Sequence, residues 1–217
     1  MMNEVAFTKF AAYLLTDGCV TFEGDGGLYA TLINKDEKIL SDFQETLIAL
    51  GLNSNITKQT RAFRVRKGCS KLVREFIDAY KIPIAGKKIL KKEAQIPDFV
   101  FQNKVLVSEF LRVVASTEGY VRFTKNRKGG FARRVVLGSL NEKFSKQLMN
   151  ALHVVDIESK LSSQGVIIYG QDNLKRFAEF VGFVDGCKFV RGPKKGREKS
   201  AELKKLLLSF SRWAERP

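Results

Sequence analysis

The chain is poor in the residues that build zinc sites and disulfide frameworks. It has three widely separated cysteines, Cys19, Cys69 and Cys187, and one histidine, His153. No two cysteines form a C-x-x-C pair, which argues against a structural zinc site and against a network of disulfides. This cysteine usage is typical of a reducing, intracellular compartment, such as the cytoplasm of a prokaryote or an organelle.

Long apolar segments are also absent. No run approaches the roughly 18 apolar residues that are needed to span a bilayer. The N-terminal sequence MMNEVAFTKF does not combine a basic region with the apolar stretch of an export signal. Hydrophobic residues still make up 44% of the chain and charged residues 28%, so an ordinary globular core can form.

Acidic residues are in deficit. The chain has 38 Lys and Arg against 23 Asp and Glu, a formal net charge of +15 and a pI near 9.8. Such a charge favours a polyanionic partner. Arginines occur in strand-like segments as well as elsewhere, which favours a sheet laid on nucleic acid over an amphipathic helix on a membrane. On composition alone, a basic protein with solvated charged faces is the alternative.

The strongest pattern is an internal repeat. FAAYLLTDG at residues 10–18 and LRVVASTEG at residues 111–119 are both apolar helical runs that end in an acid followed by glycine. The acids are Asp17 and Glu118. Each glycine suits a helix C-terminal position with positive φ.

The same order of elements follows each of these segments. Alternating residues after each glycine predict a strand, and glycine-rich turns at 23–27 and 125–130 lead to second strands at 28–33 and 131–138. Helices N-capped by Asp36 and Asn141 follow. The remaining expected elements are hairpins at 54–67 and 157–169, helices at 70–80 and 172–181, and a final helix at 199–214.

The order α-β-β-α-β-β-α therefore occurs twice, which predicts an α+β fold with duplicated halves. We expect a first half at residues 1–80, a basic, proline-punctuated connector at 81–104, a second half at 105–182, and a basic loop with a C-terminal helix at 183–217.

The duplicated acids predict a chemical site. Small residues such as Ala11, Ala12 and Ala115 would let the two helices pack side by side and bring Asp17 and Glu118 together. Two carboxylates at the negative ends of two helix dipoles repel each other unless a cation intervenes. A hard divalent ion such as Mg²⁺ resolves this conflict and could promote phosphodiester hydrolysis. Alternatively, each acid merely caps a surface turn.

These two segments resemble the motifs of the LAGLIDADG homing endonucleases in their single-chain, two-motif form, and the resemblance covers essentially the whole chain. It implies a pseudo-symmetric fold with a central two-helix interface and two saddle-shaped antiparallel sheets that straddle double-stranded DNA. It also implies a monomeric enzyme that makes a site-specific double-strand break. Because no protein-splicing residues flank the motifs, we expect an intron-encoded enzyme rather than an intein.

The resemblance also implies roles for particular residues. Asp17 and Glu118 would hold Mg²⁺, with Mn²⁺ or Ca²⁺ able to occupy the same sites, and the carbonyls of Thr16 and Thr117 would be extra ligands. Asn34 and Lys35 match a family pocket where a lysine stands beside a polar amide. The second half departs from this pattern at residues 139–140, which read Ser-Leu. Either the two DNA strands are cut unequally, or Lys125 or Lys143 substitutes.

Outward positions on the predicted strands are the candidates for base contacts, since Arg suits guanine and Asn or Gln suits adenine. They are Thr21, Glu23, Tyr29, Thr31, Gln59, Arg61, Arg64 and Arg66 in the first half, and Arg122, Thr124, Asn126, Arg133, Arg134 and Gln164 in the second. The neighbours Arg133 and Arg134 cannot both face DNA. Lys194, Lys195 and Arg197 are expected either to contact phosphates or to form a solvated loop. Because the halves differ, we expect an asymmetric target.

Three other functions are compatible with the sequence. A DNA-binding regulator without catalysis and an RNA-splicing maturase could both use this scaffold, and a general basic RNA-binding protein is a remoter alternative. The presence of both Asp17 and Glu118 argues against a pure regulator. It leaves open an enzyme that is both endonuclease and maturase.

Overall fold

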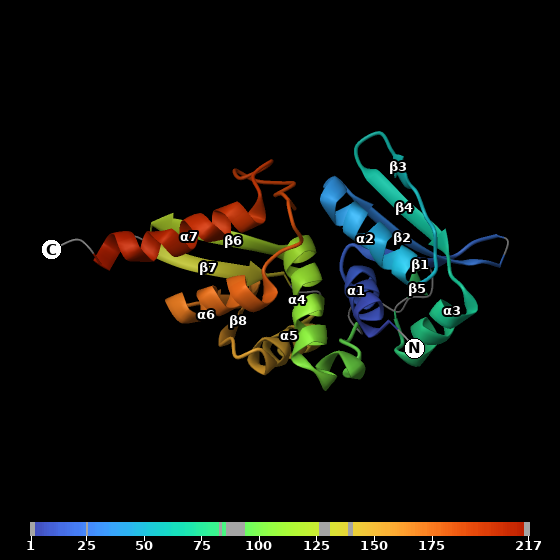
Figure 1. Ribbon diagram of the computed structural model, residues 1–217, viewed down its shortest axis with the longest axis horizontal. Helices are drawn as coiled ribbons and strands as arrows, with labels where there is room; N and C mark the ends of the chain where they lie inside the picture. The colour runs from blue at the N-terminus through green and yellow to red at the C-terminus, as the bar shows by residue number, and fades with distance from the viewer. Residues whose placement is uncertain are drawn as a thin grey trace.

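The computed structural model describes residues 3–24, 26–82, 84–85, 94–125, 131–138 and 141–214. Two halves lie side by side, with helices α1 and α4 next to each other at their junction (Figure 1). None of the described helices is both long and apolar enough to cross a membrane.

The first half has the predicted order of elements. They are α1 (Glu4–Leu15), β1 (Gly18–Phe22), β2 (Leu28–Asn34), α2 (Glu37–Ala49), β3 (Ile56–Lys58), β4 (Phe63–Gly68) and α3 (Lys71–Ala79), followed by the short strand β5 (Ile84–Ala85). Asp36 is the N-cap of α2, as predicted, and its side chain accepts a hydrogen bond from the Lys38 amide.

The second half repeats this order. The 3₁₀ helix η2 (Asp98–Gln102) precedes α4 (Lys104–Glu118), β6 (Gly119–Lys125), β7 (Phe131–Leu137), α5 (Glu142–Val154), β8 (Ser159–Ser162), β9 (Gly165–Tyr169) and α6 (Gln171–Arg176), which continues into the π-helical turn η3 (Phe177–Val181). Asn141 caps α5, as predicted. The last described element is α7 (Lys199–Ala214).

The sheets of the two halves share one design. Strand order is β3-β4-β2-β1-β5 in the first sheet and β6-β7-β9-β8 in the second. Equivalent strands pair antiparallel, and Gly18 lies opposite Leu32 just as Gly119 lies opposite Leu137. The first sheet adds β5, which runs parallel to β1 and was not predicted. The α+β duplication predicted from the sequence is therefore confirmed.

One hydrophobic core joins the halves. Inward strand residues such as Leu32 and Leu137 are fully buried and belong to the same cluster as the central helices. At the junction of α1 and α4, Ala11, Ala12 and Ala115 are also fully buried. Small side chains allow this close helix contact, so the sequence pattern fixes where the two helices meet.

The glycines after the motif acids are required for space rather than for positive φ, so the reason given by the sequence analysis was wrong. Gly119 has φ −90° and ψ 154°, which any residue can adopt. A Cβ there would lie 2.4 Å from the Ala115 carbonyl oxygen and 2.9 Å from its Cα. A Cβ at Gly18 would lie 2.8 Å from the Tyr13 carbonyl oxygen. Each strand therefore starts directly against the helix that precedes it.

We expect Gly119→Ala to destabilise the protein by about 1–3 kcal/mol, because the added methyl group meets backbone that cannot move aside easily. Gly24→Ala is the matched control, since a Cβ at Gly24 meets nothing within 4 Å. Urea unfolding of the two variants checks this. Equal stabilities would mean that the helix and strand can separate without cost.

Candidate functional site

The two predicted acids lie at equivalent ends of the central helices. Asp17 follows α1 by two residues, and Glu118 is the last residue of α4. The hydroxyls of Thr16 and Thr117 donate to carbonyls of their own helices, at 2.8 Å to Ala12 and 2.9 Å to Val113. Both threonine hydroxyls are therefore engaged within their own helices. The groups that Thr16 and Thr117 could offer to a metal are their main-chain carbonyls.

The Lys199 ammonium lies at the end of α4, where it donates to the carbonyls of Ser116 and Gly119. Burial lowers the pKa of this lysine, and the nearby Cys187 thiol and the carboxylates of Asp17, Asp36 and Glu118 act in the opposite direction. Carboxylates of both halves therefore contribute to the electrostatic surroundings of Lys199. The sequence marks Lys199 only as the start of the last helix.

Asn34 holds the first acid. Its amide nitrogen donates to the Asp17 carboxylate at 2.8 Å, and its amide oxygen accepts from the Asp36 backbone N–H at 2.9 Å. The strand β2 ends at Asn34. This residue is therefore fixed from both sides and sets the orientation of the Asp17 carboxylate.

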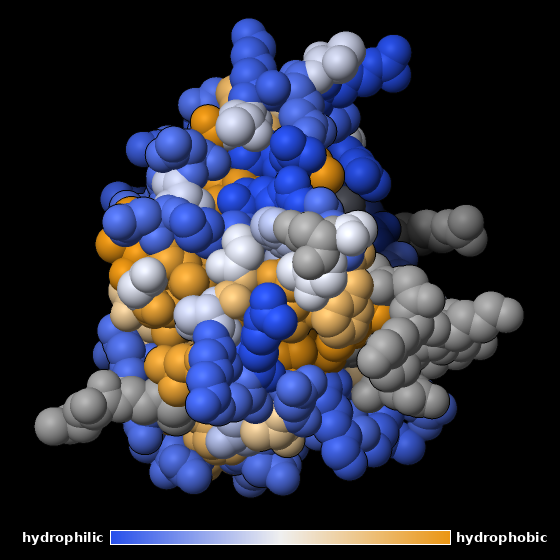
Figure 2. All heavy atoms as spheres, turned by 90° about the vertical axis from the view of Figure 1, so that its right-hand side faces the viewer, coloured by the Kyte–Doolittle hydropathy of each residue, from blue (hydrophilic) through white to orange (hydrophobic). Residues whose placement is uncertain are grey.

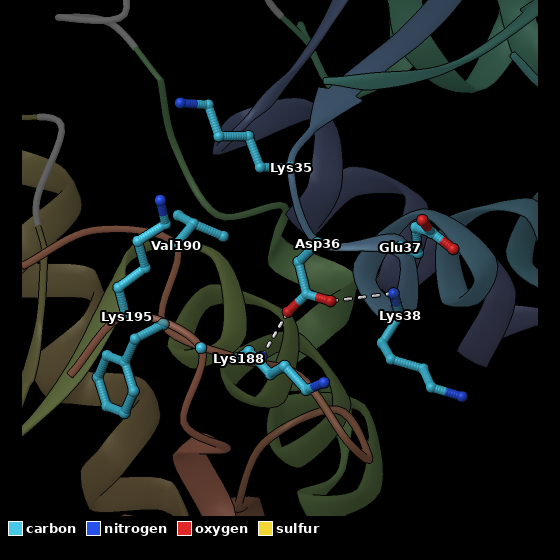
Figure 3. A pocket seen from close by; sticks show the side chains of 9 residues that line it. Lys35, Asp36, Glu37, Lys38, Lys188, Val190 and Lys195 are labelled. Atoms are coloured by element: carbon cyan, nitrogen blue, oxygen red, sulfur yellow. Dashed lines mark hydrogen bonds between the residues drawn. The ribbon is translucent and has the colours of Figure 1, made fainter. Parts of the chain in front are cut away.

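Lys35 lies at the rim of a cavity of about 440 Å³ between the start of α2 and residues 188–196. In Figure 3 the ammonium ends of Lys35 and Lys195 extend to the same side, whereas those of Lys38 and Lys188 extend to the other. The Asp36 side chain lies between these two groups of lysines and accepts hydrogen bonds from the backbone amides of Lys38 and Lys188. The cavity thus presents a cationic edge that is made from the first half and the C-terminal segment.

The second acid has different surroundings. The Gly138 amide donates to the Glu118 carbonyl at 3.1 Å, and a Cβ at Gly138 would lie 3.5 Å from a Glu118 carboxylate oxygen. Residues 139–140, where the sequence departs from the family pocket, lie outside the described residues.

Lys125 lies at the far end of β6, roughly 20 Å along the strand from Gly119. It is therefore a poor substitute for Lys35. Lys143 is exposed in the first turn of α5.

The outer face of the first sheet carries polar residues that were predicted to contact bases. Thr31 lies opposite Arg66, and Thr21 lies opposite Tyr29. The Arg66 guanidinium lies 4.1 Å from the centre of the Tyr29 ring and forms an ion pair with Glu23. Thr31 is only 9% exposed.

The first sheet also extends its polar surface at its outer edge. Arg64 follows the same alternation as Arg66 on β4, whereas Gln59 and Arg61 lie in the turn between β3 and β4. Seen from the first-half side, hydrophilic side chains dominate the upper part of the surface, at the level of the β3–β4 hairpin (Figure 2).

The outer face of the second sheet is also basic. Arg122 and Arg134 lie opposite each other on β6 and β7. Gln164 accepts hydrogen bonds from Arg122 and from the Tyr120 hydroxyl, both at 3.2 Å, and Thr124 is exposed further along β6. Asn126 lies outside the described residues.

Arg133 lies on the opposite face, which corrects the prediction that it contacts DNA. Its guanidinium donates to the Ser209 hydroxyl at 2.7 Å and to the Ser209 carbonyl at 3.0 Å, and lies 4.6 Å from the centre of the Phe210 ring. It also lies opposite Phe123 in the sheet. Arg133 therefore attaches α7 to the second sheet.

The basic loop is more ordered than the sequence suggested. Lys194 pairs with Glu202 at 2.9 Å, donates to the Val121 carbonyl at 3.2 Å and is 25% exposed. Arg197 lies 3.5 Å from Glu202 but is mostly exposed, and Lys195 is also exposed. Hydrogen bonding by Lys194 is the main reason why the pKa of Glu202 falls to about 2. Lys194 is therefore tied to the protein, contrary to the expectation of a phosphate contact or a solvated loop.

Among the described residues, no three His, Cys, Asp or Glu side chains gather as a metal cluster. Asp17 and Glu118 carry carboxylate oxygens, the donor type that a hard divalent ion prefers, and such an ion would need carbonyls, waters or phosphates to complete its shell. Cys69 and Cys187 are buried thiols, and burial raises the pKa of each to about 11.

The fold is thus duplicated, each of its two adjacent central helices ends at an acid, and basic residues lie on the outer faces of both sheets. The family model of the LAGLIDADG-like domain matches residues 4–82 and 106–182. The chain therefore belongs to the LAGLIDADG family, as the sequence motifs predicted.

Solved structures share the fold at low sequence identity. I-DmoI in complex with DNA and Mn is 13% identical, with a TM-score of 0.56, 82% of this chain covered and 97% of that chain. I-WcaI bound to its DNA recognition sequence is 14% identical, with a TM-score of 0.54 and coverages of 86% and 85%. The N-terminal LAGLIDADG domain of DUF199/WhiA is 13% identical, with a TM-score of 0.55 and 84% of each chain covered. No curated protein matches the chain.

Proposed function

We propose that the protein is a site-specific homing endonuclease that makes a metal-dependent double-strand break in a long, asymmetric DNA target. The observation that carries this proposal is the position of Asp17 and Glu118, one from each half, at the equivalent ends of the adjacent helices α1 and α4. The fold shared with I-DmoI and I-WcaI, both solved with their DNA, supports the same class. We further propose an intron-encoded enzyme that acts as a monomer, since one chain carries both motifs.

In this proposal, Asp17 and Glu118 hold Mg²⁺ with help from the carbonyls of Thr16 and Thr117. Such an ion supplies Lewis-acid chemistry, which polarises the phosphate and lowers the pKa of water. I-DmoI has been solved with Mg, with Mn and with Ca, which supports a divalent metal as the cofactor. Asn34 orients the Asp17 carboxylate, and Lys35, the next residue in the chain, would neutralise a phosphate close to the cut.

We propose that the outer faces of both sheets read the DNA. Arg66 on the first sheet, and Arg122 opposite Arg134 on the second, give both outer faces guanidinium groups that could donate to bases or phosphates. The proposed contacts are Thr21, Glu23, Tyr29, Thr31, Gln59, Arg61, Arg64 and Arg66 on the first half, and Arg122, Thr124, Arg134 and Gln164 on the second. Lys195 and Arg197 would contact phosphates.

A randomised library of double-stranded DNA, incubated with the purified protein in Mg²⁺ or in EDTA, tests this function. We expect sequencing of the cut ends to reveal one long, asymmetric site that is enriched only with Mg²⁺. No enrichment across a range of divalent metals and temperatures would contradict an endonuclease.

Binding without cleavage is the second candidate function. The N-terminal LAGLIDADG domain of DUF199/WhiA has the same fold over 84% of this chain, so the fold is shared beyond the homing endonucleases. A DNA-binding regulator would select a site from the library by retention on the protein but would not cut it. A maturase would instead retain folded RNA in preference to DNA.

A further inference from the structure

Lys199 caps the helix that carries the second acid. Its ammonium donates to the carbonyls of Ser116 at 2.6 Å and Gly119 at 2.7 Å, and lies 3.4 Å from that of Ala115. The last carbonyls of a helix lack partners within the helix, and a cation there also offsets the negative end of the dipole. Glu118 lies between two of these carbonyls in the chain. The position of its backbone is therefore held by a side chain more than 80 residues away.

This lysine is a buried charge with specific partners. It is 5% exposed, and the rings of Phe183 and Phe189 lie 5.9 and 5.7 Å from its ammonium. Removing an ammonium from water is costly unless it is hydrogen-bonded or paired. The carbonyls supply the hydrogen bonds, and Asp17 and Glu118 supply opposite charge at longer range.

The segment before Lys199 wraps around the same helix end. The Val184 amide donates to the Ser116 hydroxyl at 2.7 Å, and the Lys199 amide donates to the Cys187 carbonyl at 3.0 Å. The Lys188 amide reaches across to Asp36, the cap of α2 in the first half. The C-terminal segment thus ties the end of α4 to Asp36 of the first half, and the backbone amide of Asp36 in turn donates to Asn34.

We propose that Lys199 is a positioning residue for DNA cleavage. It fixes the last turn of α4, and hence the position of Glu118, by donating to the main-chain carbonyls on either side of this residue. Glu118 is then held in place before a metal ion and DNA arrive. This role rests on the proposed endonuclease function. It does not require Lys199 to touch DNA, because its donors are directed to main-chain carbonyls.

Lys199→Met tests this role, since it keeps the length of the side chain but removes the donors and the charge. A displacement of a reacting group by about 1 Å can cost roughly 10²-fold in rate. We therefore expect the single-turnover cleavage rate at saturating protein to fall by about 10²-fold, with DNA affinity in EDTA within about twofold of the wild type. Lys205→Met is the matched control, because Lys205 is an exposed lysine on the same helix. It should cut at the wild-type rate.

Lys199→Arg and Lys199→Gln separate positioning from folding. Arginine retains the charge and the donors, so it should cut at least about tenfold faster than Lys199→Met. Glutamine is neutral and shorter than lysine. If Lys199→Met does not fold, Lys199→Gln is compared with Lys199→Arg in its place. A folded Lys199→Met that cuts within threefold of the wild type would overturn the proposal. Parallel losses of cleavage and DNA affinity would overturn it as well.

Hydrogen exchange of the free protein gives a readout that does not depend on cleavage. Amides at residues 115–121 should exchange faster in Lys199→Met than in Lys205→Met, while those of α2 should not change. If the wild type cuts no DNA, the proposed function fails, but this measurement still tests whether Lys199 holds the end of α4. Unchanged exchange there would refute the structural half of the inference.

Discussion

Asp17→Asn and Glu118→Gln are each expected to abolish double-strand cleavage while DNA affinity is retained. Each change replaces a carboxylate by an amide of almost the same shape, so packing at the ends of α1 and α4 is preserved. The amide carries no charge and binds a hard divalent ion poorly. We expect the cleavage rate to fall by at least about 10³-fold, which corresponds to about 4 kcal/mol in the barrier.

The comparison requires separate measurements of rate and affinity on the same DNA. Cleavage is followed under single-turnover conditions in Mg²⁺, and affinity is measured in EDTA. Glu179→Gln is a suitable control, because this glutamate is exposed on η3 and has no assigned role. Wild-type cleavage by either acid variant would show that the acid pair is not the site. Loss of binding together with cleavage would show that the acids support the fold instead.

Arg134→Ala and the neighbouring Arg133→Ala are expected to have opposite effects. Arg134 lies on the outer face of the second sheet, opposite Arg122, so its removal should weaken binding to the preferred site. A good bidentate contact to a base is worth about 1–3 kcal/mol, so we expect affinity to fall by roughly 5- to 150-fold. The free energy of unfolding should change by less than about 0.5 kcal/mol.

Arg133→Ala should instead lower stability and leave affinity almost unchanged. Arg133 is half-buried, donates to Ser209 twice and packs on Phe210, so its loss removes hydrogen bonds to a neutral helix segment together with ring contacts. We expect a destabilisation of about 1–3 kcal/mol. Urea unfolding and DNA titration of both variants check the pair. Similar affinity losses in the two variants would mean that the assignment of faces on β7 is wrong.

The order of elements could be predicted from the sequence because its signals are local and occur twice. An acid and a glycine end each motif, and Asp36 and Asn141 stand where helix caps are needed. Two copies of each signal reinforce one another. The contact between α1 and α4, which end at Asp17 and Glu118, followed from the small residues along these helices, since such residues allow the helices to touch.

The sequence could not predict which residues of β7 point to the outer face of the sheet, because polar and apolar residues do not alternate cleanly along this strand. Val135 and Val136 are both fully buried although they lie on opposite faces, since Val136 pairs with Tyr120 and Ile167 on the outer side. With apolar residues on both faces, nothing in the sequence distinguishes Arg133 from Arg134.

The role of Lys199 was hidden for a different reason. A lysine in the first turn of an amphipathic helix is ordinarily solvated, and the carbonyls that Lys199 contacts are 80 or more residues earlier in the chain. The sequence offered no repeat of this contact. It arises from the path of residues 183–198 around the end of α4.

The most direct test of the central idea, that one acid from each half builds a common metal site on DNA, is the location of Mn²⁺ in crystals of the DNA complex. Anomalous scattering identifies the ion independently of any assumed role for the residues. We predict Mn²⁺ within about 2–2.5 Å of carboxylate oxygens of both Asp17 and Glu118 and next to the phosphate that is cut. Ions bound elsewhere, with these two carboxylates turned away from the DNA, would contradict the account.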